Sequence, residues 1–398
     1  MTPARSAELV LVTPTGDLLG RLPPVAVETP WWQDVEPVVR AIRARDGIAI
    51  TVLRLLDAEH DRPPGGRVTY LAETADPVAL LPWSGALDEQ PLRQAYAKPG
   101  GPAADLAWAE SVIAGLSPAR TGPAVQIRTW NLSSLWRVPV PSQTLWLKVV
   151  PAFFAHEGAL LERLAGERVP RLLGRDGGRM LLAEIAGADL YEATLPQCLE
   201  MVNILVGLQR CWMGRAAELD AIGLPDWRGP TLTPAIADVV TRTAEELPAG
   251  VHAKLERFLR ELPARFAALS ACGLGDGLVH GDFHPGNFRG HGSDITLLDW
   301  GDSGIGHPLL DQAAFLDRVP EAARETVRSH WLGLWRAAVP GSDPARAAAL
   351  LAPIAAARQA VIYRRFLDHI EPAERPYHRH DPAEWLGRVA ALEDEASL

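Results

Sequence analysis

The chain has 398 residues, 47% of them hydrophobic and 22% charged, which is typical of a globular protein large enough for two or three domains. Its 39 basic and 49 acidic residues give a net charge of −10, which argues against a general nucleic-acid binder. No basic segment followed by an apolar stretch opens the chain, and no run of about 18 apolar residues occurs. We therefore expect a cytoplasmic protein with no nucleic-acid or membrane partner.

Residues 7–81 have alternating strand and helix patterns. Apolar runs at 7–13, 48–56 and 67–73 predict strands. Residues 34–47 predict a helix that begins with an Asp34 cap and ends at Gly47. Proline and glycine cluster in residues 96–108, which predicts a connection between domains. We place an α/β domain at residues 1–95 and a linker at residues 96–122.

A second mixed region begins near residue 123. Residues 124–130 and 135–140 predict a hairpin around the turn "NLSS", and residues 144–150 and 179–185 predict further strands. A helix is expected at residues 156–166, and long helices at 195–212, 252–272 and 345–370. This pattern predicts a strand-rich part at residues 123–187 and a mostly helical part at residues 188–398.

The stretch "LVHGDFHPGNF", residues 278–288, places a polar cluster between apolar segments. Buried polar groups are either paired or used in chemistry. Asp282 lies five residues before Asn287, and the apolar run "ITLLDW" contains Asp299 near its end. One aspartate can accept a proton from a hydroxyl, and the other two side chains offer the oxygen ligands that Mg²⁺ prefers. This order matches the template for phosphoryl transfer.

Lys148 is the second unusual feature. Only three of the 39 basic residues are lysines, and this one lies within the apolar run "TLWLKVV". Glu157 follows nine residues later in the predicted helix. A lysine and glutamate so placed can form the ion pair that holds the α and β phosphates of a nucleotide.

The motifs "HGDFHPGN" and "LLDWGDSGIGHPLLDQA" resemble those of the aminoglycoside phosphotransferase and choline kinase-like family, over about residues 123–398. The resemblance implies an α+β, protein-kinase-like bilobal fold, ATP and Mg²⁺ as cofactors, and a small-molecule hydroxyl acceptor. The roles that it implies are Asp282 as catalytic base, Asn287 and Asp299 as Mg²⁺ ligands, Lys148 and Glu157 as phosphate anchors, Glu184, Ile185 and Ala186 as the adenine-binding hinge, and His280 and Asp311 as structural supports of the site.

Two positions depart from the family's pattern. The turn at residues 131–134 has no glycine, so Ser133, Ser134 and backbone amides would have to replace a glycine-rich phosphate loop. His307 stands where the family often has aspartate. His284 is expected to be an ordinary histidine rather than a ligand.

Residues 7–81 also resemble a Nudix domain, through the helix-glycine-strand layout of residues 34–56 and the strand that follows. A working Nudix helix carries metal-binding glutamates, but this chain has Ala41, Ala44 and Arg45 at those positions. We expect this domain to be catalytically silent, and an unrelated small α/β domain remains the alternative.

The sequence therefore predicts an ATP-dependent O-phosphotransferase. The main alternative is a non-catalytic nucleotide-binding regulator, or pseudokinase; a protein kinase is disfavoured because no long activation segment follows Asp299. Acidic residues late in the chain favour a cationic acceptor such as an aminoglycoside or amino sugar. These residues are Asp302, Glu371, Glu374, Asp381 and Glu384.

Overall fold

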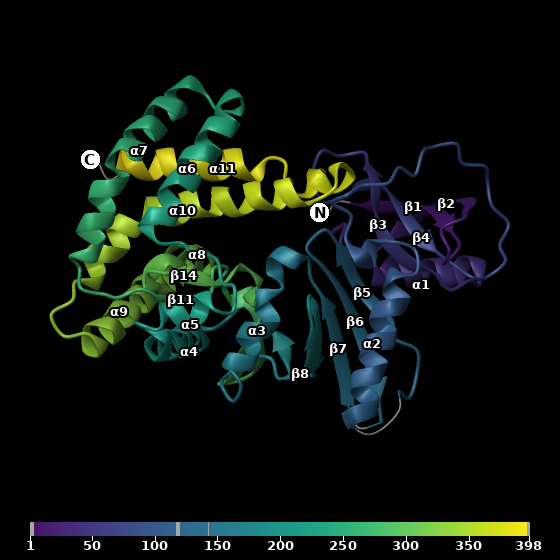
Figure 1. The fold of residues 1–398 in the computed structure, drawn as a ribbon, viewed down its shortest axis with the longest axis horizontal. Helices are drawn as coiled ribbons and strands as arrows, with labels where there is room; N and C mark the ends of the chain where they lie inside the picture. Colours follow the sequence, from purple (N-terminus) through teal and green to yellow (C-terminus); the bar gives the residue numbers. More distant parts are fainter. Residues whose placement is uncertain (1–3, 117–119, 142, 396–398) are drawn as a thin grey trace. The chain divides into compact units, whose positions relative to one another are not determined.

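The computed structural model describes residues 4–116, 120–141 and 143–395 (Figure 1). The chain divides into two compact units. The first unit comprises Met1–Ala155, Leu172–Glu184 and Phe366–Arg379, and the second comprises His156–Arg171, Ile185–Arg365 and His380–Leu398. Most of the expected α/β domain and strand-rich part thus falls in one unit, and the domain boundaries drawn from the sequence stay a prediction.

A four-stranded sheet begins the first unit. Its order is β2-β1-β4-β3, with β1 parallel to β4 and the other pairs antiparallel. The strands are β1 Arg5–Val12, β2 Leu18–Val27, β3 Thr51–Ala58 and β4 Gly66–Glu73. Leu9 and Leu11 belong to one buried cluster and Val10 and Val12 to another, because successive side chains of a strand point to opposite faces. Both faces of the sheet are therefore packed.

Helix α1, Glu36–Asp46, packs on one face of this sheet through Val38 and Ile42. Its last turn ends at Gly47, whose φ of 74° gives the predicted left-handed termination. The predicted cap is wrong: Val35 is the N-cap, and no side chain caps the helix. Asp34 instead pairs with Arg128 of β5 at 3.2 Å.

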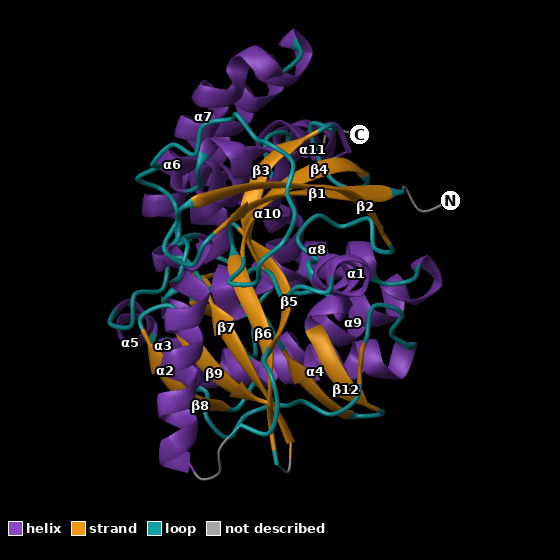
Figure 2. Cartoon of the chain, turned by 90° about the vertical axis from the view of Figure 1, so that its right-hand side faces the viewer, coloured by secondary structure: helices purple, strands orange, loops and turns teal. Residues whose placement is uncertain are grey.

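The second sheet of this unit is antiparallel, in the order β5-β6-β7-β9-β8. Its strands are β5 Val125–Trp130, β6 Ser133–Val140, β7 Gln143–Val149, β8 Leu172–Asp176 and β9 Arg179–Ala183. Helix α2, Gly101–Leu116, runs alongside β7 and β9 where the sequence predicted a linker (Figure 2). Ala109 and Ile113 of this helix share a core cluster with Leu145 and Leu147. The sequence did not predict this helix, because its packing on the sheet outweighs the Pro and Gly at its start.

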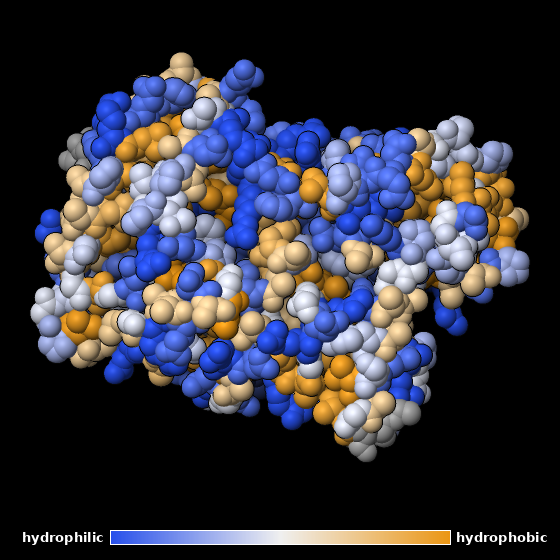
Figure 3. Space-filling model, in the orientation of Figure 1, coloured by the Kyte–Doolittle hydropathy of each residue, from blue (hydrophilic) through white to orange (hydrophobic). Residues whose placement is uncertain are grey.

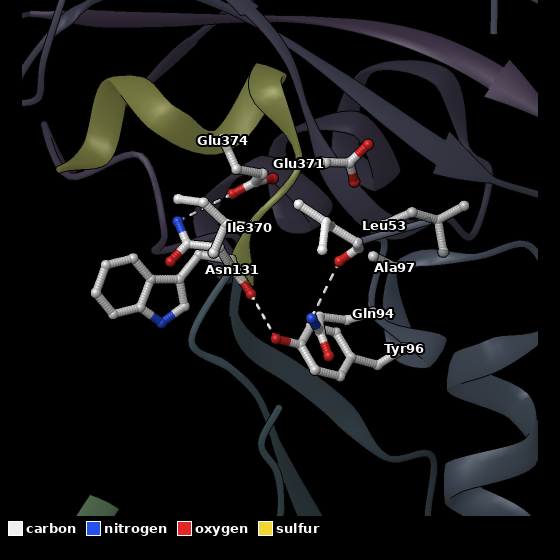
Figure 4. Close-up of a pocket in the computed structure, with 10 residues that line it drawn as sticks. Leu53, Gln94, Tyr96, Ala97, Asn131, Ile370, Glu371 and Glu374 are labelled. Atoms are coloured by element: carbon white, nitrogen blue, oxygen red, sulfur yellow. Dashed lines mark hydrogen bonds between the residues drawn. The ribbon is translucent and has the colours of Figure 1, made fainter. Parts of the chain in front are cut away.

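The segment Phe366–Arg379 returns to the first unit and is fixed there by buried charges. Glu371 lies 2.9 Å from Arg93 and 3.8 Å from Arg54. Glu374, in the 3-10 helix Pro372–Tyr377, accepts hydrogen bonds from the Leu55 amide at 2.8 Å and from Asn131 at 3.3 Å. Figure 4 shows the two glutamates beside the small cavity between this segment and the β5–β6 turn.

The second unit is mostly helical. Its longer helices are α3 His156–Arg163, α4 Leu195–Trp212, α6 Gly229–Thr243, α7 Ala249–Ser270, α9 Glu321–Ala338, α10 Pro344–His369 and α11 Asp381–Glu395, with short α5 Ala216–Asp220 and α8 Gln312–Arg318. The last four residues of α10 belong to the first unit. Strands β10 Ala188–Asp189, β12 Phe288–His291 and β13 Asp294–Leu297 form one small sheet, and β11 Gly277–Val279 pairs with β14 Gly304–Gly306. These two sheets carry the polar motifs.

Two surface features stand out among the described residues. Helix α10 is long and apolar enough to cross a membrane by length and composition, but half of that window is buried in the protein, as in a core helix. Hydrophobic side chains also gather at the edge of the four-stranded sheet (Figure 3), where Leu18 and Leu19 of β2 are 45% and 41% exposed.

The buried carboxyl of Glu374 predicts a pH-dependent stability. Burial raises its pKa to about 7; the Leu55 amide opposes this shift, the charge of Glu371 adds to it, and Asn131 opposes it. Between about pH 4.5 and 7 the folded chain holds a proton that the unfolded chain has lost, so this group makes stability fall as pH rises through that window. Glu374→Gln should flatten the dependence of the unfolding free energy on pH there, as measured by urea denaturation.

Glu110→Gln is the matched control, because Glu110 is a half-exposed carboxyl of the same unit. Its unfolding free energy should follow the pH dependence of the wild type. An unchanged pH slope in Glu374→Gln would contradict the prediction.

Candidate active site

The two polar motifs lie side by side because a hairpin joins them. Strand β11 leads into the turn at His280, the 3-10 helix Pro285–Asn287 follows, and β12 pairs with β13. The Leu298 amide then donates to the Asn287 carbonyl at 2.7 Å. Asp299, the next residue, is thereby placed beside the turn that carries Asp282 and Asn287.

Asp282 and Asn287 are in direct contact. The Asn287 side-chain nitrogen donates to the backbone oxygen of Asp282 at 2.8 Å and to its carboxylate at 3.0 Å. The amide nitrogen is thus engaged, and the amide oxygen points away from that contact. The Asp282 side chain keeps 42% of its surface exposed, so a reactant can approach it.

His284 is a neighbour of Asp282 that the sequence analysis did not connect with it. Its Nδ1 accepts a hydrogen bond from the Gly286 amide at 3.0 Å, so the proton of a neutral ring lies on Nε2, 3.5 Å from the Asp282 carboxylate. Burial alone would raise the pKa of Asp282, but His284, His280 and Asn287 together lower it to about 2. The Asp-x-His spacing within the turn was the signal that could have found this residue.

Asp311 and His280 hold the turn from beneath. The buried Asp311 carboxylate accepts hydrogen bonds from the His280 amide at 2.9 Å and the Gly281 amide at 2.8 Å. The His280 ring donates from Nε2 to the Leu298 carbonyl at 2.8 Å and accepts from the Asp282 amide at 3.3 Å. Burial lowers the pKa of His280, which keeps the ring in the neutral form that these bonds require. The structure brings together the two residues predicted as supports.

The Gly281 carbonyl is held from the opposite side by two residues of α10. Arg358 donates to it at 2.5 Å and Gln359 at 3.1 Å. A Cβ at Gly281, whose φ is 93°, would lie 2.0 Å from the Asp302 carbonyl, so only glycine fits here. Sequence reasoning missed Arg358 and Gln359, because helix α10 reads only as an apolar core helix.

Asp299 has the only positive φ, 59°, among the described residues other than glycine. Such a conformation costs of order 1–3 kcal/mol and is concentrated at functional sites. The amide of the next residue, Trp300, donates to the Glu157 carboxylate at 3.3 Å, so α3 is tied to this loop within the second unit. The carboxylate of Asp299 and the amide oxygen of Asn287 are hard ligands on adjacent segments, and this donor set fits Mg²⁺.

The remaining predicted nucleotide contacts come mainly from the first unit. Lys148 is half-buried in β7, where its register partners are Leu135 and Met180. Lys148 lies in the first unit and Glu157 in the second, so their ion pair stays a prediction.

The two serines of the β5–β6 hairpin already have partners. The Ser133 hydroxyl accepts the Trp130 indole N–H at 3.1 Å, and the Ser134 hydroxyl accepts that of Trp136 at 3.0 Å. Ser134 is also buried. Each hydroxyl keeps its own proton to donate, so a role for the serines at the phosphates stays a prediction.

The hinge residues differ in what they can offer a nucleotide. The Glu184 carboxylate accepts the Trp146 indole N–H at 2.6 Å within the first unit. The Ile185 carbonyl accepts from Arg289 at 2.9 Å within the second unit. The adenine contacts expected from the backbone of Glu184, Ile185 and Ala186 stay a prediction.

His307, which stands where the sequence comparison expected aspartate, caps a short helix. Its Nδ1 accepts a hydrogen bond from the Leu309 amide at 3.2 Å at the start of the 3-10 helix Pro308–Asp311. Burial lowers its pKa to about 3, so the ring is neutral and can accept this bond. A neutral imidazole thus accepts the hydrogen bond of the Leu309 amide at the position where the family often has a charged aspartate.

The structure removes two residues from the expected cationic-acceptor cluster. Glu371 and Glu374 are buried in the first unit, where Arg54, Arg93 and Asn131 are their partners. Carboxylates engaged in this way cannot bind an acceptor, so that part of the expectation is wrong.

Comparison with known proteins identifies the family. The model of the phosphotransferase enzyme family matches residues 134–350, which is more than half of the chain. The chain belongs to this family. The resemblance inferred from the two motifs is thereby confirmed, whereas residues 1–95 lie outside the match and their Nudix-like character stays a prediction. A search of curated proteins gives no match.

Solved structures of phosphotransferases have the same fold. A macrolide 2'-phosphotransferase of Brachybacterium faecium matches with a TM-score of 0.51 and 16% identity, over 70% of this chain and 97% of its own. A choline/ethanolamine kinase family protein of Mesorhizobium loti matches with a TM-score of 0.50 and 21% identity, over 73% of this chain and 94% of its own. Choline kinase LicA of Streptococcus pneumoniae matches with a TM-score of 0.51 and 15% identity, over 73% of this chain and 99% of its own. The predicted kinase-like fold is confirmed.

The contacts of Asp311 predict that this residue contributes to the unfolding free energy of the protein. Asp311→Asn leaves an amide group facing two buried backbone N–H donors, and an unsatisfied buried donor costs about 1–3 kcal/mol. The unfolding free energy in urea should fall by about 2 kcal/mol. Asp238→Asn, which removes an exposed carboxylate paired with Arg242 on α6, should change it by less than about 0.5 kcal/mol. Equal losses of unfolding free energy in the two variants would refute the role of Asp311 in holding the turn.

Proposed function

We propose that the protein transfers the γ-phosphoryl group of ATP to a hydroxyl group of a small molecule. The observation that carries this proposal is the partly exposed Asp282 carboxylate, held by Asn287 and His284 beside Asp299. This is the order and local geometry that phosphoryl transfer uses. Membership of the phosphotransferase family supports it.

Asp282 is the residue that we assign to the acceptor. Its ionised carboxylate accepts the hydrogen of the attacking hydroxyl, orients the oxygen toward phosphorus and takes the proton as the new oxygen–phosphorus bond forms. The bond between the β and γ phosphates breaks, and ADP leaves. A carboxyl with so low a pKa is a weak base, so most of the rate would come from positioning.

Asn287 and Asp299 are the residues that we assign to Mg²⁺. The bound ion would neutralise charge on the transferred phosphoryl group and orient it. Lys148, with Glu157, would hold the α and β phosphates, and the backbone of Glu184, Ile185 and Ala186 would bind adenine. We place the enzyme in the cytoplasm.

The acceptor that we propose is an aminoglycoside, an amino sugar or a related hydroxyl compound. Two of the matched structures are of a macrolide 2'-phosphotransferase and a choline kinase, which supports a small-molecule acceptor. Asp302, Asp381 and Glu384 remain in the second unit as acidic candidates for a cationic group. A panel of aminoglycosides, amino sugars, neutral sugars and amino alcohols, assayed for ADP release, tests this class. Equal stimulation by neutral and cationic acceptors would remove the preference for a cation.

The alternative is a nucleotide-binding regulator on the same fold. It is favoured only by the turn at residues 131–134, where glycine is absent. The intact Asp282, Asn287 and Asp299 favour an enzyme. ATP binding without turnover for any acceptor would favour the regulator.

Asp282→Asn tests the assigned base directly. The amide can neither take a proton nor carry the charge that orients the hydroxyl, so acceptor-stimulated ADP release should fall by at least about 100-fold. Nucleotide affinity, measured by calorimetry, should change little because the variant keeps the residues assigned to the phosphates. Near-normal turnover in this variant would show that the base is misassigned.

His284→Ala tests how the turn controls protonation. Without the His284 hydrogen bond the pKa of Asp282 should rise, because burial then acts with less opposition. A higher pKa of Asp282 means that more of this carboxyl is protonated at acidic pH. The acid limb of the kcat/KM profile should therefore move to higher pH. His252→Ala, on the surface of α7, should leave the profile unchanged. An unmoved acid limb in His284→Ala would rule out this coupling.

A further inference from the structure

A cavity of about 550 Å³ lies within the second unit, where the start of α6 and the end of α7 meet α10. This volume falls within the range of about 300–1,000 Å³ that small-molecule pockets have. Its lining includes Pro230 of α6, Ser270 of α7 and Leu351 of α10. Among the described residues that line it, none is Asp282 or a residue assigned above to nucleotide, metal or acceptor.

Apolar side chains form the floor of this cavity. The half-buried ring of Phe266 packs on the start of α6, where a Cβ at Gly229 would lie 2.8 Å from the ring. Ser270 and Asp276 are exposed and therefore lie toward the mouth. An apolar floor below a polar mouth suits a ligand with an apolar body and one polar group. The buried leucines of the floor are Leu269, Leu274, Leu310 and Leu351.

Asp226 and Arg228 line the cavity as an ion pair whose charges are already compensated. Arg228 donates to one Asp226 oxygen from Nε at 2.8 Å and to the other from Nη2 at 2.9 Å. Asp226 also accepts the Arg228 amide at 2.9 Å and the Thr231 hydroxyl at 3.0 Å, at the start of α6. The pair therefore offers no net charge to a ligand, and the positive end of α6 already faces a carboxylate.

Asp276 is the remaining charge of the described lining, because His307 is neutral. The Asp276 carboxylate makes no hydrogen bond or ion pair with another described residue, and its backbone carbonyl accepts the Gly214 amide at 3.1 Å. Desolvation raises the pKa of Asp276; the charge of Arg228 opposes this shift, and that of Asp226 adds to it. The lining thus has one incompletely compensated charge, and this charge is negative. Complementarity of charge favours a cation here.

The cavity borders a segment that supports the turn carrying Asp282. Leu310 lines the cavity, and the next residue, Asp311, accepts the His280 and Gly281 amides. A ligand on the floor of the cavity therefore contacts the segment that holds this turn, although Asp282 itself does not line the cavity.

We propose that this cavity binds a small primary amine with an apolar body, whose protonated amino group lies beside the Asp276 carboxylate and whose body packs on Phe266 and the buried leucines. The ammonium group donates charge-assisted hydrogen bonds to a carboxylate that receives none from the described residues. The site stands on its own geometry and does not depend on the phosphotransferase proposal.

Calorimetry on the full chain without nucleotide, at neutral pH, tests the site with three probes that share an aromatic body: naphthylmethylamine, naphthylmethanol and naphthylacetate. The protonated amine should bind at one site at least about fivefold more tightly than the alcohol, because charge-assisted hydrogen bonds are stronger than neutral ones. Equal or tighter binding of the alcohol or of the carboxylate, or no binding of the amine, would overturn the proposal.

Variants separate the two parts of the site. Asp276→Asn should weaken the amine about fivefold and leave the alcohol unchanged, because it removes the charge alone. Phe266→Ala should weaken both, because it removes apolar contact. Asp238→Asn, which removes an exposed carboxylate of α6, is the matched control and should change neither. Asp276 is exposed, so its variant decides the matter even where Phe266→Ala fails to fold. Amine affinity equal to that of the wild type in Asp276→Asn would overturn the assignment.

The acceptor proposed above is also cationic, so one more variant separates the two sites. Asp302→Asn should leave amine affinity unchanged, because Asp302 does not line this cavity. Weaker amine binding in Asp302→Asn but not in Asp276→Asn would place the amine at the acceptor site and overturn the proposal. Absence of turnover with every acceptor, with amine binding at Asp276 retained, would refute the phosphotransferase proposal alone.

Discussion

The hydrogen bonds from the backbone of His280 and Gly281 to Asp311 are the interaction on which the turn that carries Asp282 depends. The left-handed conformation of Gly281 reverses the chain there, and two buried amides are left without a strand partner. Only a carboxylate has two oxygens that can each accept such a bond with no competing donor. Asp311 arrives from a separate segment, so the turn is fixed by a long-range contact rather than by its own sequence.

The same peptide group is held on its other side by a cation. Arg358 donates to the Gly281 carbonyl, and the charges of Asp311, Asp302 and Asp282 oppose the desolvation that lowers the pKa of its guanidinium. A buried charge is tolerated only where partners compensate it. Asp282 is thus the partly exposed end of a buried arrangement of opposite charges.

The sequence predicted those features that local pattern determines. Helix α4, the hairpin around "NLSS", the left-handed Gly47 and the association of Asp282, Asn287 and Asp299 all follow from periodicity, turn residues and motif order. The sequence could not predict the contacts of Arg358 and Glu374, whose partners lie 77 and 319 residues away in the chain. Contacts at such separations produce no periodic pattern in the sequence. Helix α2 was missed for a related reason, since its packing on the second sheet outweighs the proline and glycine at its start.

The glycine-free turn at residues 131–134 has a structural explanation in the first unit. The Asn131 side chain donates to Glu374 and its oxygen contacts the His378 ring at 3.1 Å, while Trp130 packs edge-on against Tyr377 at 5.4 Å. Glycine would give this turn freedom; here side chains of the returning segment Phe366–Arg379 remove that freedom. A turn fixed in this way loses little conformational entropy when a ligand binds to its backbone. The absence of glycine is therefore compatible with the proposed phosphate-binding role of the turn.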